Sequence, residues 1–99
     1  MKVEIDMVQL MILSVLVEQK ATSPGMGMTL NEIVEEVNKS ADFDYSPVTI
    51  KRKVWALRDK WQYVDAKLKR RLSDLFYITA KGREMREVLF SEEKIEGRN

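Results

Sequence analysis

Apolar residues recur most regularly between Ser46 and Trp61, and their spacing predicts a helix over 46–61. They follow one another every three or four residues, which draws a single stripe along a helix comprising Ile50, Val54, Leu57 and Trp61. Ser46 is a favourable N-cap, and Pro47 suits the first helical position, where its missing N–H needs no partner. The opposite side is rich in cations and comprises Val48, Lys51, Arg52, Trp55 and Asp59. The pattern therefore predicts one buried face and one cationic face.

The stretch 4–20 is predicted to be a helix whose apolar residues cover most of its circumference. Such a helix has to be covered on more than one side, and a chain of 99 residues forms only one modest core. We therefore expect a second copy of the chain to cover part of it, with the chain's own helices as the alternative cover. The residues expected at this homodimer contact are Met7, Val8, Met11, Ile12 and Val15.

Two more helices are predicted, at 29–39 and 80–94. Thr29 and Glu32 have the spacing of a capping box, and the buried stripe that follows comprises Leu30, Ile33, Val34 and Val37. Thr79 is expected to cap the last helix, whose inward side comprises Met85, Val88 and Leu89, with Phe90 alongside. Residues 1–94 are thus expected to form one domain. Residues 95–99 are expected to fray, and the IEGR that they contain matches a protease site used in fusion proteins.

The segment 62–79 contains two β-prone stretches, a short one at 63–64 and a clearer one at 75–79. A lone strand needs a partner, so we expect a β-hairpin with a basic tip. A short helix over 64–73 is the alternative, because apolar residues there also fit helical spacing. The predicted fold is therefore mostly α, with three helices, a hairpin and a fourth helix.

Composition excludes several kinds of site. The chain has neither cysteine nor histidine, which excludes disulfides, a structural zinc site and the Cys–His or Ser–His–Asp arrangements of nucleophilic enzymes. We therefore expect no enzyme, no metal site and no cofactor. The apolar run 7–17 is too short to span a bilayer, so we expect no membrane partner and a cytoplasmic protein. Nothing in the sequence specifies a small-molecule effector.

Charge is distributed unevenly although the net charge is only +1. Residues 46–72 carry nine Lys or Arg against two Asp, whereas residues 1–45 carry three cations against eight acids. A basic segment that coincides with a predicted helix and hairpin is typical of nucleic-acid binding. Asp42 and Asp44, close to the start of the basic helix, argue the other way because they would repel phosphates.

Three local motifs resemble those of winged helix-turn-helix regulators of the PadR and MarR kind. Residues 29–34 (TLNEIV) resemble the start of the family's scaffold helix, and 46–57 (SPVTIKRKVWAL) resemble its recognition helix. Residues 77–83 (YITAKGR) are similar to the closing strand and helix start of the wing. The resemblance implies a winged helix-turn-helix fold and sequence-specific binding of double-stranded DNA.

In such a motif the recognition helix enters the major groove and the wing contacts the adjacent backbone or minor groove. The candidate DNA contacts of the recognition helix are Ser46, Pro47, Val48, Thr49, Lys51, Arg52, Lys53 and Arg58. Those of the basic wing at 65–75 are Lys67, Lys69, Arg70 and Arg71. For Trp55, on the open side of the helix, packing under the wing or a partner is favoured over contact with DNA.

We therefore expect a homodimeric transcriptional regulator, a repressor in preference to an activator. Two alternatives stay open: a DNA-binding protein of plasmid or phage replication or partition, and a winged-helix module that binds only protein.

Overall fold

The computed structural model describes residues 5–41, 44–68 and 74–97, with side chains as far as residue 89. The chain is mostly helical with one antiparallel hairpin, which confirms the predicted fold class and element order. The elements are α1 (Met7–Glu18), η1 (Pro24–Met26), α2 (Leu30–Ser40), α3 (Pro47–Asp59), β1 (Val64–Lys67), β2 (Leu75–Ile78) and α4 (Ala80–Gly97). No helix in the described ranges is both long and apolar enough to cross a bilayer.

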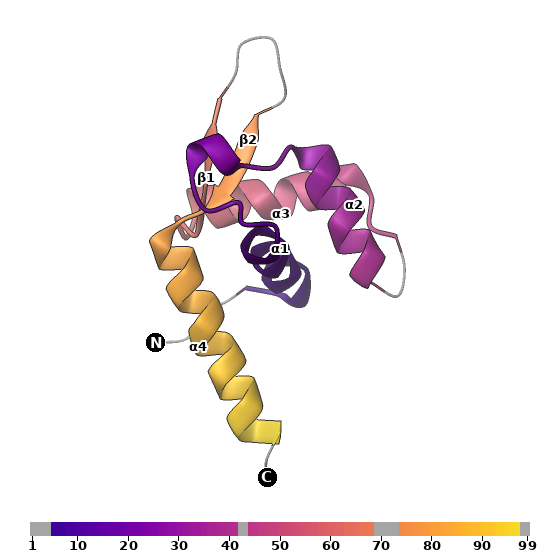
Figure 1. The fold of residues 1–99 in the computed structure, drawn as a ribbon. Helices are drawn as coiled ribbons and strands as arrows, with labels where there is room; N and C mark the ends of the chain where they lie inside the picture. Colours follow the sequence, from indigo (N-terminus) through magenta and orange to yellow (C-terminus); the bar gives the residue numbers. More distant parts are fainter. Residues whose placement is uncertain (1–4, 42–43, 69–73, 98–99) are drawn as a thin grey trace.

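Helix α1 lies at the centre of the molecule, and α2, α3, α4 and β2 all contact it (Figure 1). It is shorter than predicted at both ends. Asp6 caps it by accepting a hydrogen bond from the Gln9 N–H at 2.8 Å, so the helix begins at Met7 and not at Glu4. Lys20, at φ 59°, lies in the left-handed region, so the chain leaves the helix after Glu18.

The core is a single cluster of apolar side chains from every layer of the fold. Its fully buried members include Ile12, Leu13 and Leu16 of α1, Ile33 and Val37 of α2, and Ile50, Val54 and Leu57 of α3. The predicted buried stripes of α2 and α3 are therefore confirmed, except that Leu30 and Val34 are half-buried and Trp61 lies outside the helix.

The caps predicted for α2 and α3 are both present. Thr29 accepts a hydrogen bond from the Glu32 N–H, and the Glu32 carboxylate accepts one from the Thr29 N–H. The Ser46 hydroxyl accepts one from the Thr49 N–H at 3.2 Å. Helix α2 runs to Ser40, one residue beyond the predicted limit.

Helix α3 ends at Asp59, two residues before the predicted end at Trp61. Gln62, at φ 55°, turns the chain into the hairpin. Trp61 is half-buried and stacks on the buried Tyr63, with ring centroids 5.9 Å apart. Trp61 therefore packs on the segment that follows α3 and does not continue the helical stripe.

Strands β1 and β2 form the predicted hairpin, hereafter the wing, with Val64 opposite Ile78 and Lys67 opposite Leu75. Strand β1 occupies Val64–Lys67, which rules out the alternative short helix for the described part of 64–73. The loop at 21–28, which had no predicted pairing, lies against the outer edge of β2. Met28 and Phe76 exchange two backbone hydrogen bonds, and the Ile78 N–H donates to the Ala21 carbonyl at 2.9 Å.

Thr79 caps α4 as predicted, accepting a hydrogen bond from the Gly82 N–H at 3.0 Å. The helix continues to Gly97, three residues beyond the predicted end, so the expected frayed tail is helical as far as that residue. Met85 packs on the core, but Val88, expected to face inward, is 49% exposed. Phe90 lies outside the residues with described side chains.

Gly82 sits where α4 passes closest to the chain that enters the wing. A Cβ atom at this position would lie 2.1 Å from the Tyr63 carbonyl oxygen and 2.8 Å from an Ile78 side-chain carbon. Because the nearer atom belongs to the backbone, rotation of a side chain cannot relieve the clash. The glycine is therefore a packing requirement.

Replacing Gly82 with alanine should lower the free energy of unfolding by about 2 kcal/mol or more, because α4 has to move away from Tyr63. Urea unfolding followed by circular dichroism measures the change. Gly25→Ala is the matched control, since its added Cβ meets no atom within 4 Å. Equal stabilities of the two variants would contradict the packing requirement.

Candidate nucleic-acid interface

The first turns of α3 present an open face to solvent. Val48 is 59% exposed, and Lys51 and Arg52 are also exposed, while the helix side facing the core is fully buried. Ser46 and Pro47 are exposed at the start of the helix, and the half-buried Thr49 accepts a hydrogen bond from the Ser46 hydroxyl at 3.0 Å. A helix whose inner side is packed on the core and whose first turns are exposed has the shape needed to enter a groove.

The cations of α3 fall into two groups. Among the described residues, neither Lys51 nor Arg52 lies within 4 Å of a carboxylate. Lys53 and Arg58, by contrast, are both held by acids of the same chain. The sequence assigned all four to DNA contact, but only the first two have side chains that are free to meet an external anion.

Lys53 connects α3 to the start of α1. Its ammonium group pairs with Asp6, the residue that caps α1. The buried Gln9 adds to this connection, because its side-chain amide donates to the Lys53 carbonyl at 3.5 Å. Lys53 therefore serves intramolecular packing in this structure.

Arg58 connects the end of α3 to the wing. Its Nε donates to Asp65 at 3.2 Å, and its terminal nitrogen donates to Asp59 at 3.1 Å. The guanidinium group also lies over the Trp55 ring, 5.3 Å from the centroid. The hydrogen bond to Asp65 raises the pKa of Arg58 further above its ordinary value.

Asp65 is the acid on β1 at which these contacts meet. Besides Arg58, it accepts a hydrogen bond from the Ala66 N–H at 2.8 Å and one from the Tyr77 hydroxyl at 3.3 Å. These donors favour the ionised carboxylate, with the Ala66 N–H the largest cause, and lower the pKa of Asp65 below its ordinary value. The sequence did not single out this acid, although it is one of only two in the basic segment.

Trp55 packs under the wing. Its ring meets Phe76 of β2 edge-on, with centroids 5.3 Å apart and planes at 82°. This confirms the predicted packing of Trp55 under the wing. Together with Lys51, these rings line a hollow between α3 and the wing, to which Leu30 and Asp74 also contribute. Leu30 was predicted only as a member of the buried stripe of α2, and no role was predicted for Asp74.

Strand β1 of the wing lies against α3 (Figure 1). Lys67, at the end of β1, is exposed as a DNA contact would require. Lys69, Arg70 and Arg71 lie outside the described residues, as do Asp42 and Phe43. Asp44 is exposed, and Tyr45 packs on the core.

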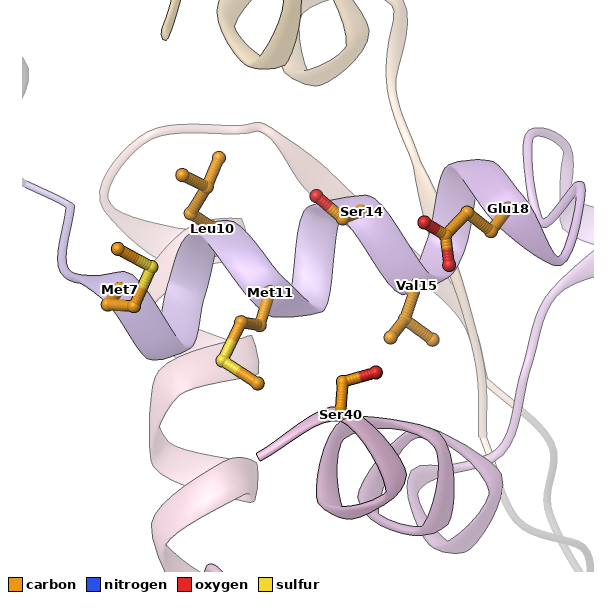
Figure 2. Close-up of a pocket in the computed structure, with 7 residues that line it drawn as sticks. All are labelled: Met7, Leu10, Met11, Ser14, Val15, Glu18 and Ser40. Carbon is orange, nitrogen blue, oxygen red and sulfur yellow. The ribbon is translucent and has the colours of Figure 1, made fainter. Parts of the chain in front are cut away.

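The residues expected at a dimer contact do not all reach the surface. Ile12 is fully buried in the core of its own chain and Val15 is nearly so, whereas Met7 is 65% exposed and Val8 and Met11 are half-buried. A groove runs along the outer side of α1 and is lined by Met7, Leu10, Met11, Ser14, Val15, Glu18 and Ser40. Figure 2 shows Met11 and Val15 directed toward Ser40 at the end of α2.

Comparison with solved structures identifies the architecture. A DNA-binding TubR fragment from Clostridium botulinum superimposes with a TM-score of 0.68 over 88% of this chain and 99% of the fragment, at 23% identity. TubR from Bacillus megaterium pBM400 superimposes with a TM-score of 0.66 over 82% and 81% of the two chains, at 14% identity. The chain shares its fold with the TubR proteins. No family model and no curated sequence matches the chain.

The TubR fold is of the winged-helix type, which confirms that part of the resemblance seen in the sequence. In this fold α2 and α3 correspond to the helix-turn-helix, and β1 and β2 to the wing. The more specific resemblance to PadR and MarR regulators remains a prediction, because both structural neighbours are TubR proteins. The comparison places the open face of α3 and the wing on a winged-helix scaffold.

Replacing Asp65 with asparagine should reduce the dependence of stability on pH. Because folding lowers the pKa of Asp65, its carboxylate stabilises the fold fully above the ordinary pKa of 3.8. That contribution is lost as the pH falls through the lower folded value. Between about pH 5 and about pH 2, the wild type should therefore lose more free energy of unfolding than the variant. Urea unfolding at each pH measures this, and parallel pH profiles would contradict it.

Proposed function

We propose that this protein binds double-stranded DNA sequence-specifically as a homodimer, with no enzymatic activity, metal or cofactor. The observation that carries the proposal is the open start of α3. It exposes Val48, Lys51 and Arg52 next to a wing, and its far side is fully buried. The fold shared with a DNA-binding TubR fragment supports the same conclusion.

The exposed residues of α3 are suited to reading base edges in the major groove. Arg52 and Lys51 can donate to the N7 and O6 acceptors of guanine, and Val48 can contact the methyl group of thymine. Ser46 and Pro47 stand where the helix start meets the DNA backbone, and Thr49 lies beside them. These six residues form the proposed recognition surface of α3.

The wing supplies phosphate contacts. Lys67 is exposed on β1, and Lys69, Arg70 and Arg71 follow it in the sequence. Cations that contact phosphates release counterions and strengthen binding to any duplex. We assign Lys53 and Arg58 to intramolecular roles and not to this surface, because each has an acidic partner in the chain.

Homodimerisation would use the groove on α1. Met7 and Met11 are among the residues that line it, and the Met7 side chain is 65% exposed in the single chain (Figure 2). A second copy related by a two-fold axis would cover both grooves at once. Two α3 helices would then face half-sites about 34 Å apart on a pseudo-palindromic duplex.

The biological role is best matched by plasmid or phage partition. We favour this alternative over a transcriptional repressor because both structural neighbours are TubR proteins. The protein-interaction module is the remaining alternative, favoured by the low net charge and the exposed Asp44. Such a module would bind no duplex even at low salt, which separates it from the proposed function.

Arg52→Gln should lower affinity for a preferred duplex, selected from a random library, by about tenfold or more. Affinity for random duplex should fall much less, because a base contact discriminates between sequences and a phosphate contact does not. Fluorescence anisotropy titrations on both duplexes measure the difference. An equal loss on the two duplexes would contradict base readout by Arg52. Absence of any binding by the wild type at low salt would overturn the DNA-binding proposal.

The matched comparison is a wing-tip variant in which Lys69, Arg70 and Arg71 are each replaced with glutamine. It should lose affinity for both duplexes alike, and the slope of log affinity against log salt should become shallower by as much as about 2.7. Unchanged affinity in this variant would remove the wing from the proposal.

Met7→Glu should raise the dissociation constant of the dimer by about tenfold or more, because a carboxylate would be buried against a second apolar groove. The side chain is 65% exposed in the single chain, so the fold itself should tolerate the change. Sedimentation equilibrium measures the dissociation constant. Met26→Glu is the matched control, a methionine 60% exposed outside the groove. A dimer that is equally stable in both variants would place the interface elsewhere.

A further inference from the structure

We infer that Arg58, Asp65 and Tyr77 are positioning residues that hold the wing at a fixed angle to α3. The inference rests on the proposed DNA-binding function and assigns a role within it to three residues outside the proposed contact surface, two of which donate hydrogen bonds to the third, Asp65. Arg58 belongs to α3, Asp65 to β1 and Tyr77 to β2, so the three side chains join the helix to both strands of the wing.

The polar part of this connection is centred on one carboxylate. One Asp65 oxygen accepts from the Arg58 Nε at 3.2 Å and from the Ala66 N–H at 2.8 Å, and the other accepts from the Tyr77 hydroxyl at 3.3 Å. Asp65 and Tyr77 are directly opposite each other in the hairpin register. A carboxylate with three donors has little freedom to rotate, so it transmits the position of Arg58 to both strands.

An aromatic contact joins the same helix to the opposite face of the wing. Trp55 of α3 meets Phe76, which is adjacent to Tyr77 on β2. Successive side chains of a strand point to opposite faces, so Phe76 and Tyr77 project to either side of the wing. Helix α3 therefore contacts both faces, through Trp55 on one and through Arg58 and Asp65 on the other. Contacts on both faces oppose rotation of the wing in either direction.

Fixing the wing in advance matters because the hairpin is short. Each strand has four residues, and an isolated hairpin of this size is marginally stable in water. A loosely attached wing would lose conformational freedom when its cations meet phosphates, and this loss would weaken binding. The connection to α3 removes that cost before DNA arrives.

The test compares two substitutions that change charge identically. Asp65→Asn and Asp59→Asn each remove one negative charge from a partner of Arg58 and leave it one acceptor oxygen in place of two. Asp59 lies on α3, however, and among the described residues its carboxylate has no hydrogen bond to β1 or β2. General electrostatics would tighten DNA binding in both variants by the same small amount. The positioning role instead makes Asp65→Asn bind random duplex about threefold to tenfold more weakly with a shallower salt slope, and leaves Asp59→Asn at wild-type affinity or slightly tighter.

Tyr77→Phe provides a second variant, because it removes only the hydroxyl hydrogen bond and keeps the aromatic packing. It should weaken binding in the same direction by a smaller factor. Thermal unfolding without DNA verifies that each variant is folded at the assay temperature. If Asp65→Asn is unfolded there, Tyr77→Phe alone decides the outcome.

The decisive measurement is a double-mutant cycle with the wing-tip variant. If Asp65 acts through the wing, its substitution should weaken binding about threefold to tenfold in the wild-type background. Once the three wing-tip cations are gone, it should weaken binding by a clearly smaller factor, because Lys67 is then the one cation of the proposed wing contact that remains. The same loss in both backgrounds, or wild-type affinity for Asp65→Asn and Tyr77→Phe, would overturn the inference. Failure of the wild type itself to bind duplex would instead overturn the proposed function.

Discussion

Burial of three aliphatic side chains on α3 decides which side of that helix faces solvent. Ile50, Val54 and Leu57 are fully buried in the same cluster as the central residues of α1. Removing such side chains from water stabilises the fold by about 1.5–3 kcal/mol each, so the helix cannot rotate about its axis without a large loss. The exposure of Lys51 and Arg52, on the other side, is a consequence of that packing.

Most features set by local chemistry could be predicted from the sequence, although the capping box of Asp6 and Gln9 at the start of α1 was missed. The caps at Thr29, Ser46 and Thr79 were recognised because each depends on a side chain and an N–H three residues away. The C-terminal ends of α1 and α3 could not be predicted, because Lys20 and Gln62, which follow them, adopt left-handed backbone angles without being glycine. No local pattern in the sequence marks those two positions.

The candidate site shows the same division. Spacing alone identified the open face of α3, but it could not separate cations that face solvent from those held by acids of the chain. Lys53 and Asp6 are 47 residues apart in sequence, and this pairing arises only when α1 packs on α3. Trp55 was interpreted correctly because a large aromatic residue on an open face requires cover. Helical spacing placed Leu30 in the buried stripe of α2, but nothing in the sequence placed Leu30 or Asp74 in the hollow beside Trp55.

The pairing of residues 21–28 with β2 has a further consequence for assembly. Unpaired N–H and C=O groups along a sheet margin can recruit a strand from another molecule and lead to aggregation. In the described structure the carbonyl of Ala21 and the backbone of Met28 occupy those groups at Ile78 and Phe76. The segment before α2 thus protects the base of the hairpin from intermolecular strand addition, and shortening it would expose a surface prone to self-association.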